Sequence, residues 1–193
     1  MSFHDQQRAA ALLMGGSGGG TYYGNTDTPF DGGDGHIDES FSDHGIFYRI
    51  DFGSAISGTI TELNVRCRNI NNSSNETQWA IYDDNAGEPG TAFWSTGRFT
   101  DPDSGPTTYT KTLSESITST QYVWVGMGFE NSPTFGARIY YDTSTGQEVR
   151  VVDLDTNEWL NDFADGSAYT DLTNNATAVN YTTRDLEVNI KVE

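Results

Sequence analysis

Oxygen-bearing side chains at alternating positions give this sequence its nearest approach to a chemical signature. Asp153, Asp155 and Asn157 have the D-x-D-x-N spacing that opens a Ca²⁺-binding loop, in which alternate oxygens converge on a hard cation. The rest of that signature is missing, because Glu158 replaces the loop glycine and Ala164 replaces the bidentate glutamate. Two interpretations stay open, a Ca²⁺ site and a plain turn after a strand. We expect no cofactor other than this candidate ion.

Catalytic constellations are harder to find. The sequence matches G-x-S-x-G only at residues 15–19, within a Gly-rich run that is a flexible tether by composition and not a nucleophile elbow. Its three histidines, His4, His36 and His44, all lie near the N-terminus. The stretch 31–44 combines histidines with aspartates that could ligate a transition metal, but no spacing there is diagnostic. Acidic residues are so frequent that no carboxylate pair stands out as acid and base. We therefore expect that the protein is not an enzyme.

Aromatic side chains are the better functional signal. Tyr122 and Trp124 alternate with the apolar row Val123–Phe129 and so belong to its opposite face, and Trp159 adds a third candidate surface aromatic. Aromatic faces pack against sugar C–H groups and also anchor protein interfaces. A third interpretation is that both faces of this strand are buried, one of them by the segment 21–45 or by the long loop 155–181. All three stay open.

The elements that would position these residues are β-strands. From Ile46 onward apolar residues recur at every second position, which is typical of antiparallel strands with one dry and one wet face. The pattern predicts an all-β, antiparallel sandwich or barrel. The predicted strands are Ile46–Phe52, Thr59–Asn69, Thr77–Tyr82, Ala92–Phe99, Thr107–Leu113, Gln121–Glu130, Ala137–Asp142, Gln147–Leu154 and Asp185–Val192.

The first 45 residues differ in composition from the rest. Phe3–Met14 predicts a short helix, and residues 15–20 form a Gly-rich tether. Residues 21–45 are rich in Gly and Asp, which predicts an irregular arm. We therefore divide the chain into an N-terminal region, 1–45, and a β-domain, 46–193. The helix would be marginal alone, so it is either an anchor to another protein or a functionless end. The candidate anchor residues are Phe3, Leu12, Leu13 and Met14.

Charge limits the partners. The chain has 28 acidic against 10 basic residues, a net charge of −18, and no basic stripe, so we expect neither nucleic-acid nor anionic-membrane binding. The acidity fits a solvated surface or a Ca²⁺ site. Cys67 alternates with Leu63 and Val65, which predicts a buried hydrophobe. No signal peptide or membrane span is visible, so we expect synthesis in a cytoplasm and use without export.

A turn gives the sequence its family resemblance. Ile81-Tyr82-Asp83-Asp84-Asn85-Ala86-Gly87-Glu88-Pro89-Gly90 combines strand residues with turn formers. It resembles the IYxDNxGxPG turn of a jelly-roll-like β-sandwich domain found in tailed-phage virion proteins and bacterial surface proteins. Further similarity covers residues 46–193, including Gln121–Gly126 and Thr183–Ile190. The resemblance implies an antiparallel jelly-roll β-sandwich and a non-catalytic role, and it transfers no ligand residues.

We therefore expect a structural virion protein of a phage or virus. It would be a capsid decoration protein or a fibre-like appendage, located in the virion and anchored through its N-terminal arm. Its partners would be other virion proteins, and further copies of itself in a homo-oligomer. The alternative is a carbohydrate-binding module that recognises a cell-surface glycan, at a tail tip or on a surface protein.

Overall fold

The computed structural model describes residues 19–26, 35–39, 44–69, 76–100, 105–129, 137–143, 148–153 and 179–193. Within these ranges the chain forms antiparallel β-strands joined by turns, which confirms the all-β prediction. The predicted helix at 3–14 lies outside the described residues. No helix long and apolar enough to cross a membrane occurs in the described part of the chain. The strands are β1 (Thr21–Gly24), β2 (Gly35–Glu39), β3 (His44–Asn69), β4 (Glu76–Asn85), β5 (Glu88–Ser95), β6 (Phe99–Thr100), β7 (Thr107–Phe129), β8 (Ala137–Thr143), β9 (Glu148–Asp153), β10 (Val179–Tyr181), β11 (Arg184–Leu186) and β12 (Val188–Val192).

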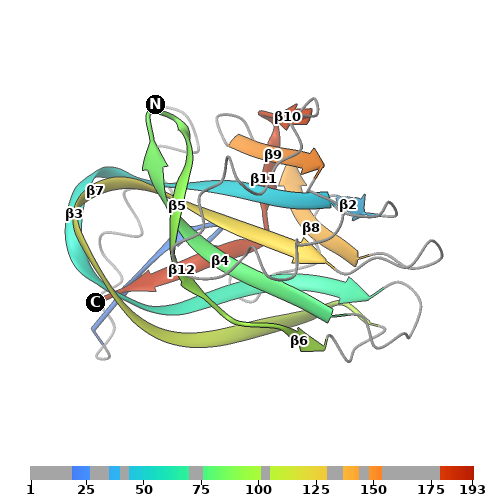
Figure 1. The fold of residues 1–193 in the computed structure, drawn as a ribbon, viewed down its shortest axis with the longest axis horizontal. Helices are drawn as coiled ribbons and strands as arrows, with labels where there is room; N and C mark the ends of the chain where they lie inside the picture. Colours follow the sequence, from blue (N-terminus) through green and yellow to red (C-terminus); the bar gives the residue numbers. More distant parts are fainter. Residues whose placement is uncertain are drawn as a thin grey trace.

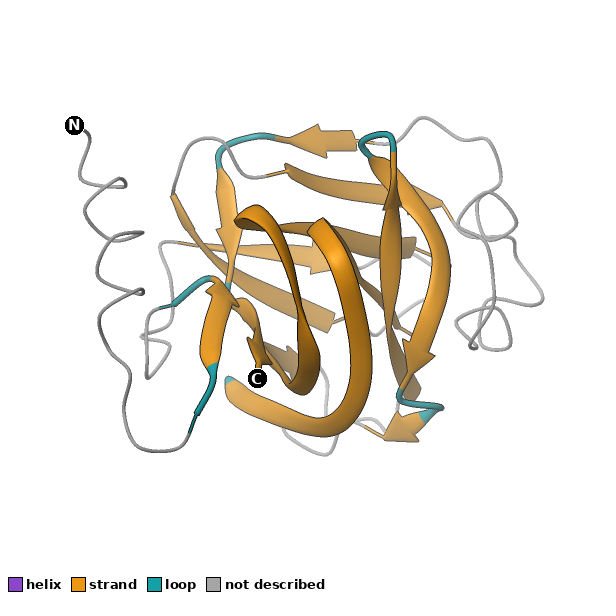
Figure 2. Ribbon diagram, turned by 90° about the vertical axis from the view of Figure 1, so that its left-hand side faces the viewer, coloured by secondary structure: helices purple, strands orange, loops and turns teal. Residues whose placement is uncertain are grey.

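Two long strands organise the molecule. The sequence predicts two separate strands within β3 and two within β7, but each is one continuous strand, of 26 and 23 residues. They pair with each other along most of their length, and the ribbon they form curves back on itself (Figures 1 and 2). The register shifts between Asp51 and Gly58, where Gly53 has a φ of 79°. On the other strand Ser119 has a φ of 50°. Bulges and positive φ angles let a paired ribbon bend without ending.

The bend gives the two halves of the ribbon different neighbours. The first half of β3 pairs with β9, while the second half pairs with β12 and β8. The second half of β7 pairs with β4, which continues into β5. The region 21–45 was predicted to be irregular, and this is wrong at two places. β1 pairs with β12 and β2 pairs with β8, so strands from both sides of the predicted boundary at residue 46 share one sheet.

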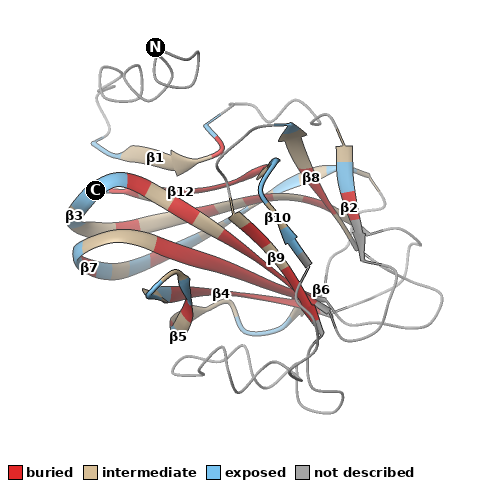
Figure 3. Ribbon diagram, turned by 90° about the horizontal axis from the view of Figure 1, so that it is seen from above, coloured by how far each residue is buried: buried red, intermediate tan, exposed pale blue. Residues whose placement is uncertain are grey.

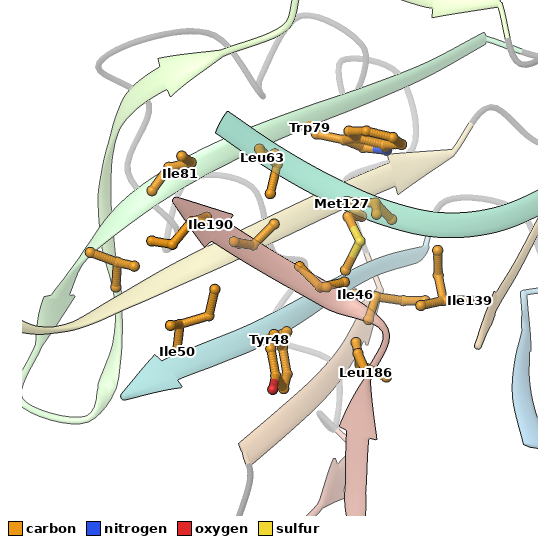
Figure 4. Close-up of a cluster of buried hydrophobic side chains, with 14 of the residues drawn as sticks. Ile46, Tyr48, Ile50, Leu63, Trp79, Ile81, Met127, Ile139, Leu186 and Ile190 are labelled. Atoms are coloured by element: carbon orange, nitrogen blue, oxygen red, sulfur yellow. The ribbon is translucent and has the colours of Figure 1, made fainter. Parts of the chain in front are cut away.

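The hydrophobic core lies between the two halves of the bent ribbon. Ile46, Tyr48 and Ile50 come from its first half, and Leu63 from its second half meets them in one buried cluster (Figure 4). The two predicted apolar rows are confirmed where their side chains are described, because Leu63, Val65 and Cys67, and Val123, Val125 and Met127, are buried in the same cluster. The side chain of Phe129 lies outside the described part. Every second residue of the predicted strand Asp185–Val192 is buried with them: Leu186, Val188, Ile190 and Val192. Burying each large apolar side chain contributes about 1.5–3 kcal/mol.

The opposite face of β3, β4 and β7 is also buried, in agreement with one of the three interpretations that the sequence leaves open for the strand with Tyr122 and Trp124. Phe47, Tyr82 and Trp124 alternate with core residues, yet each has no exposed surface. The rings of Phe47 and Tyr82 meet edge to face, with centroids 5.5 Å apart. Seen from above, buried segments fill the middle of the sheet, and exposed residues gather at the bends of β3 and β7 (Figure 3). The expectation of one dry and one wet face is therefore wrong for this part of the sheet.

Candidate functional site

A group of aromatic and charged side chains on this second buried face joins the β4–β5 turn to β3, β7 and β9. In the sheet register, Trp124 lies directly opposite Arg49 on one side and Tyr82 on the other. Arg49 lies opposite Glu148 in turn, so all four belong to one row across four strands. We call the group the Trp124 cluster; its members are Arg49, Tyr82, Asp84, Tyr122, Trp124, Glu148 and Arg150.

The turn itself is a two-residue hairpin. Asn85 and Glu88 form the last strand pair, and between them Ala86 and Gly87 have φ angles of 56° and 90°. Positive φ at both central positions matches the twist of a β-hairpin, and it suits Gly far better than Ala. The carboxylate of Asp84 accepts a hydrogen bond from the Gly87 amide at 3.1 Å, which closes the turn locally.

The strand after the turn is fixed by a second aspartate. Asp83 accepts a hydrogen bond from the amide of Thr91, across the base of the hairpin. A Cβ atom at Gly90 would lie 2.9 Å from Cγ of Asp83, so this position has no room for a side chain. Pro89 is buried beside it. The aspartates, the proline and the glycines of the β4–β5 turn therefore each have a structural role.

Asp84 connects the turn to the sheet. Its Oδ1 accepts a hydrogen bond from Nε1 of Trp124 at 2.9 Å and lies 3.0 Å from a guanidinium nitrogen of Arg49. Trp124 is fully buried, so Asp84 supplies the partner that its indole N–H would otherwise lack. The same carboxylate thus holds a turn amide, an indole and a guanidinium.

Arg150, on β9, also contacts the β4–β5 turn. Its guanidinium donates to the carbonyl oxygen of Gly87 at 2.7 Å and forms ion pairs with Glu148 at 2.8 Å and Glu88 at 3.1 Å. Burial by itself lowers the pKa of Arg150, but the hydrogen bonds to Glu148 and Glu88 outweigh it and raise that pKa. The guanidinium carbon lies 5.0 Å from the centroid of the Trp124 ring, within range of a cation–π contact.

Arg49 completes the cluster from β3, the strand that pairs with the Trp124 strand. Its guanidinium carbon lies 3.8 Å from the centroid of the Tyr122 ring and 5.7 Å from that of Trp124. It also forms an ion pair with Glu148 at 3.3 Å. Both arginines therefore have carboxylate partners inside the cluster, and both contact aromatic faces. Such an arrangement fixes the orientation of a turn, because each charge is already engaged within the protein.

The prediction of a surface aromatic at Trp124 is wrong. The residue does lie on the face opposite Val123 and Val125, as the alternation indicated, but it is fully buried, hydrogen-bonded to Asp84 and flanked by arginines. For Trp124 the interpretation that both faces of the strand are buried is the correct one. Tyr122 is half-buried, with its hydroxyl accepting a hydrogen bond from Gln121 at 2.8 Å.

Sequence reasoning missed Arg49, Arg150 and the role of Asp84. Both arginines stand at polar positions of strands in a chain with few basic residues, and the turn they contact is acidic. That charge complementarity is the one signal in the sequence that pointed to the cluster. This signal does not predict which acidic segment each arginine contacts, because every acidic segment of this chain complements an arginine equally well.

Most other predicted site residues lie outside the described residues: Phe3, Leu12, Leu13, Met14, Asp155, Asn157 and Trp159. Asp153 is the last residue of β9 and pairs with His44 in the register. The described ranges contain no group of three or more His, Cys, Asp or Glu side chains placed to hold a metal ion. The Ca²⁺ site at 153–157 stays a prediction. Cys67 is a buried free cysteine, as predicted.

A second polar network connects the N-terminal region to the core. The side-chain amide of Asn25 donates to Asp142 at 2.7 Å, and its backbone carbonyl accepts from the buried Asn189 at 2.8 Å. The hydroxyl of Tyr48 donates to Asp185, which lies opposite Asp142 in the register. Burial, followed by the charges of Asp185 and Asp142, raises the pKa of the Tyr48 hydroxyl well above its ordinary value.

Comparison with known proteins found no relative. No protein-family model, curated protein or solved structure matches the chain. The resemblance of the β4–β5 turn therefore rests on the residues of this chain alone.

Proposed function

We propose that this chain is a structural virion protein of a phage or virus, a capsid decoration protein or a fibre-like appendage. In this proposal residues 1–20 attach the protein to the particle. The β-domain is a jelly-roll sandwich that projects outward and displays its loops. No reaction is assigned to it.

The observation that carries the proposal is the β4–β5 turn. Ile81 enters the core, Asp84 connects the turn to Trp124 and Arg49, and Gly87 has the positive φ that the turn requires. The residues that carry the resemblance to the virion and surface-protein family are thus also residues that fix the conformation of this turn and join it to the sheet. This agreement supports the family's fold and its non-catalytic role for this chain.

The bent ribbon supports the jelly-roll part of the proposal. In a jelly roll, antiparallel strands wrap so that successive parts of a long ribbon enter two facing sheets. Here the two halves of β3 have different neighbours and contribute to one core between them. Figure 2 views the ribbon from the side of its bends.

The charge of the chain suits dense display on a particle. A net charge of −18 makes neighbouring copies repel at long range, which keeps displayed domains from adhering to one another unselectively. The internal ion pairs of the Trp124 cluster hold the β4–β5 turn in place without an added ligand. A turn held in this way can be presented at the surface with little conformational entropy left to lose.

The glycan-binding alternative loses its best residue, because Trp124 is buried and cannot stack on a sugar. Tyr122 is half-buried and has Arg49 over its ring. Within the described residues, no contact favours a glycan over a protein partner. We therefore propose the structural role alone.

Deleting residues 1–20 tests the proposal. Particles are assembled with the tagged full chain or with the deletion variant, purified, and assayed for the tag by quantitative mass spectrometry. We expect the full chain in the particle and a loss of at least tenfold for the deletion. Circular dichroism and the melting temperature of the deletion variant should match those of the full chain, because the described strands begin at Thr21.

Two results would refute the proposal. One is absence of the full chain from purified particles. The other is full incorporation of the variant that lacks residues 1–20, which would remove the anchor. Specific binding on a glycan array that Tyr122→Ala or Trp159→Ala abolishes would favour the carbohydrate-binding alternative.

A further inference from the structure

Among the described residues, the first half of β7 is an open edge of the sheet. Residues 107–117 pair with β3 on one side, and within the described ranges no strand pairs with their other side, because β4 begins its pairing only at Val123. This half of β7 follows the lower margin of the molecule in Figure 1. An open edge presents a row of backbone donors and acceptors that a further strand can use.

The exposure of the side chains alternates along this edge. Its outward row is exposed and consists of Thr108, Thr110, Thr112, Ser114 and Ser116. Its inward row contains Tyr109, Lys111, Leu113, Glu115 and Ile117. Within this inward row, Lys111 lies opposite Leu63 and Glu115 lies opposite Ile60, and both of these partners are fully buried. The edge therefore places two opposite charges on its core-facing side, four residues apart.

Neither of these two charges forms an ion pair within the described part of the chain. Lys111 rests over the ring of Phe99, 3.5 Å from its centroid, and no ion pair joins it to a described carboxylate. Burial lowers the pKa of Lys111, as expected for an ammonium group with little compensation. Glu115 likewise forms no ion pair with a described residue. An edge with inward charges is protected against unselective pairing, because an added strand would have to accommodate both.

One added strand accommodates both charges, namely a second copy of the same edge. We propose that two copies of this chain pair antiparallel through residues 107–119 of β7, about a two-fold axis at Leu113. Residues whose numbers sum to 226 then lie opposite each other. Lys111 of each copy meets Glu115 of the other, and Tyr109 meets Ile117 on the same face. On the outer face Thr110 meets Ser116 and Thr112 meets Ser114, which are favourable cross-strand pairs.

The charge order selects this register. A two-fold axis at Lys111 or at Glu115 would place like charges directly opposite each other, which destabilises a strand pair. An axis at Thr112 or Ser114 leaves both charges without an opposite partner. A shift of one residue in the register would bring inward residues opposite outward ones, because side chains alternate with a period of two. The axis at Leu113 alone pairs both charges, and it produces the closed, isologous contact of a two-fold dimer.

The edge also carries a bulge at the proposed axis. Between the pairs Ile60–Glu115 and Glu62–Thr112, β7 has two residues, Leu113 and Ser114, where β3 has only Thr61. A bulge increases strand twist and discourages pairing with flat edges. A second copy carries the same bulge at the same place, so the extra twist of the two strands coincides. This feature favours a second copy over an extended peptide of unrelated sequence.

Charge reversal tests the dimer. Sedimentation velocity over a concentration series should show a monomer–dimer equilibrium for the full chain. Lys111→Glu and Glu115→Lys each turn both symmetry-related pairs into repulsions, so each should raise the dimer Kd on the order of tenfold or more. The double variant restores the pairs and should return Kd to within a few-fold of the original. A chain that stays monomeric at every concentration, or a double variant no better than the single ones, overturns the proposal.

Cross-linking tests the register independently and at exposed positions. A mixture of Thr110→Cys and Ser116→Cys chains should form a disulfide-linked dimer, because these positions are opposite each other. Neither variant should link to itself, since each is about 20 Å from its own copy in this register. Cys67 is buried and contributes no background. Self-linking of either variant, or no linking of the mixture, would refute an axis at Leu113.

Discussion

The prediction that tests the structure most directly is the loss of Asp84. In Asp84→Ala the indole N–H of the fully buried Trp124 loses its acceptor, and an unsatisfied buried donor costs about 1–3 kcal/mol. The hydrogen bond to the Gly87 amide, worth about 1 kcal/mol, is lost as well. The ion pair with Arg49 adds at most about 1 kcal/mol, because both side chains are partly exposed and Arg49 keeps Glu148. We expect a total destabilisation of roughly 3 kcal/mol.

Urea unfolding followed by circular dichroism measures this loss. The midpoint should fall with little change in m, and the melting temperature should drop by roughly 6–12 °C for a chain of this size. Glu88→Gln is the matched control on the same turn. Its side chain is 60% exposed and Arg150 keeps Glu148 and the Gly87 carbonyl, so its effect should stay within about 0.5 kcal/mol.

A double-mutant cycle with Trp124→Phe isolates the indole contribution. Phenylalanine has no N–H, so Asp84→Ala should cost about 1–2 kcal/mol less in that background than in the original chain. Two outcomes would refute the reasoning. One is an Asp84→Ala variant as stable as Glu88→Gln, and the other is a cycle with no coupling between Asp84 and Trp124.

Two further predictions concern backbone strain and pH. Ala86→Gly should stabilise the protein by about 1 kcal/mol, because this position has positive φ. Gly87→Ala should destabilise it by about 1–2 kcal/mol for the same reason. Thermal melts measure both changes, and the reverse order of melting temperatures would contradict the hairpin geometry. The raised pKa of Tyr48 means that the native state keeps its proton when the unfolded chain ionises near pH 10. Its contribution to stability is therefore complete below that pH and lost above it. Tyr48→Phe should flatten the loss of stability between about pH 10 and 11, as measured by urea midpoints, and an unchanged slope would argue against a buried Tyr48 hydroxyl.

Much of the fold could be predicted because apolar alternation is a local signal. The inward rows of β3, β7 and β12 follow from the sequence pattern alone, as does the hairpin at 85–88 from its turn residues. The strand limits were less well predicted. Gly53 and Ser119 interrupt the apolar alternation of β3 and β7. The sequence pattern of a ribbon that bends at such residues is the same as that of separate strands. The short strands β1 and β2 were missed because they have only four and five residues within the Gly- and Asp-rich region 21–45, and because they pair with the distant strands β12 and β8.

The candidate site shows where local signals end. The sequence placed Trp124 on the face opposite Val123, and that was correct, but the same alternation fits an exposed and a buried tryptophan equally well. The burial of Trp124 depends on Arg49, Asp84 and Arg150, which come from three other strands. Their convergence is a matter of sheet register and not of sequence spacing.

The chain's composition and periodicity by themselves determined an acidic, all-β protein with a buried cysteine and one tight acidic turn, since each of these depends on residue type and nearest neighbours. Tertiary structure alone decided that the sheet is buried on two faces around Trp124, and that within the described strands β7 has an open edge beside Lys111 and Glu115. Those features depend on which distant strands become neighbours, and a period of two carries no information about the neighbour.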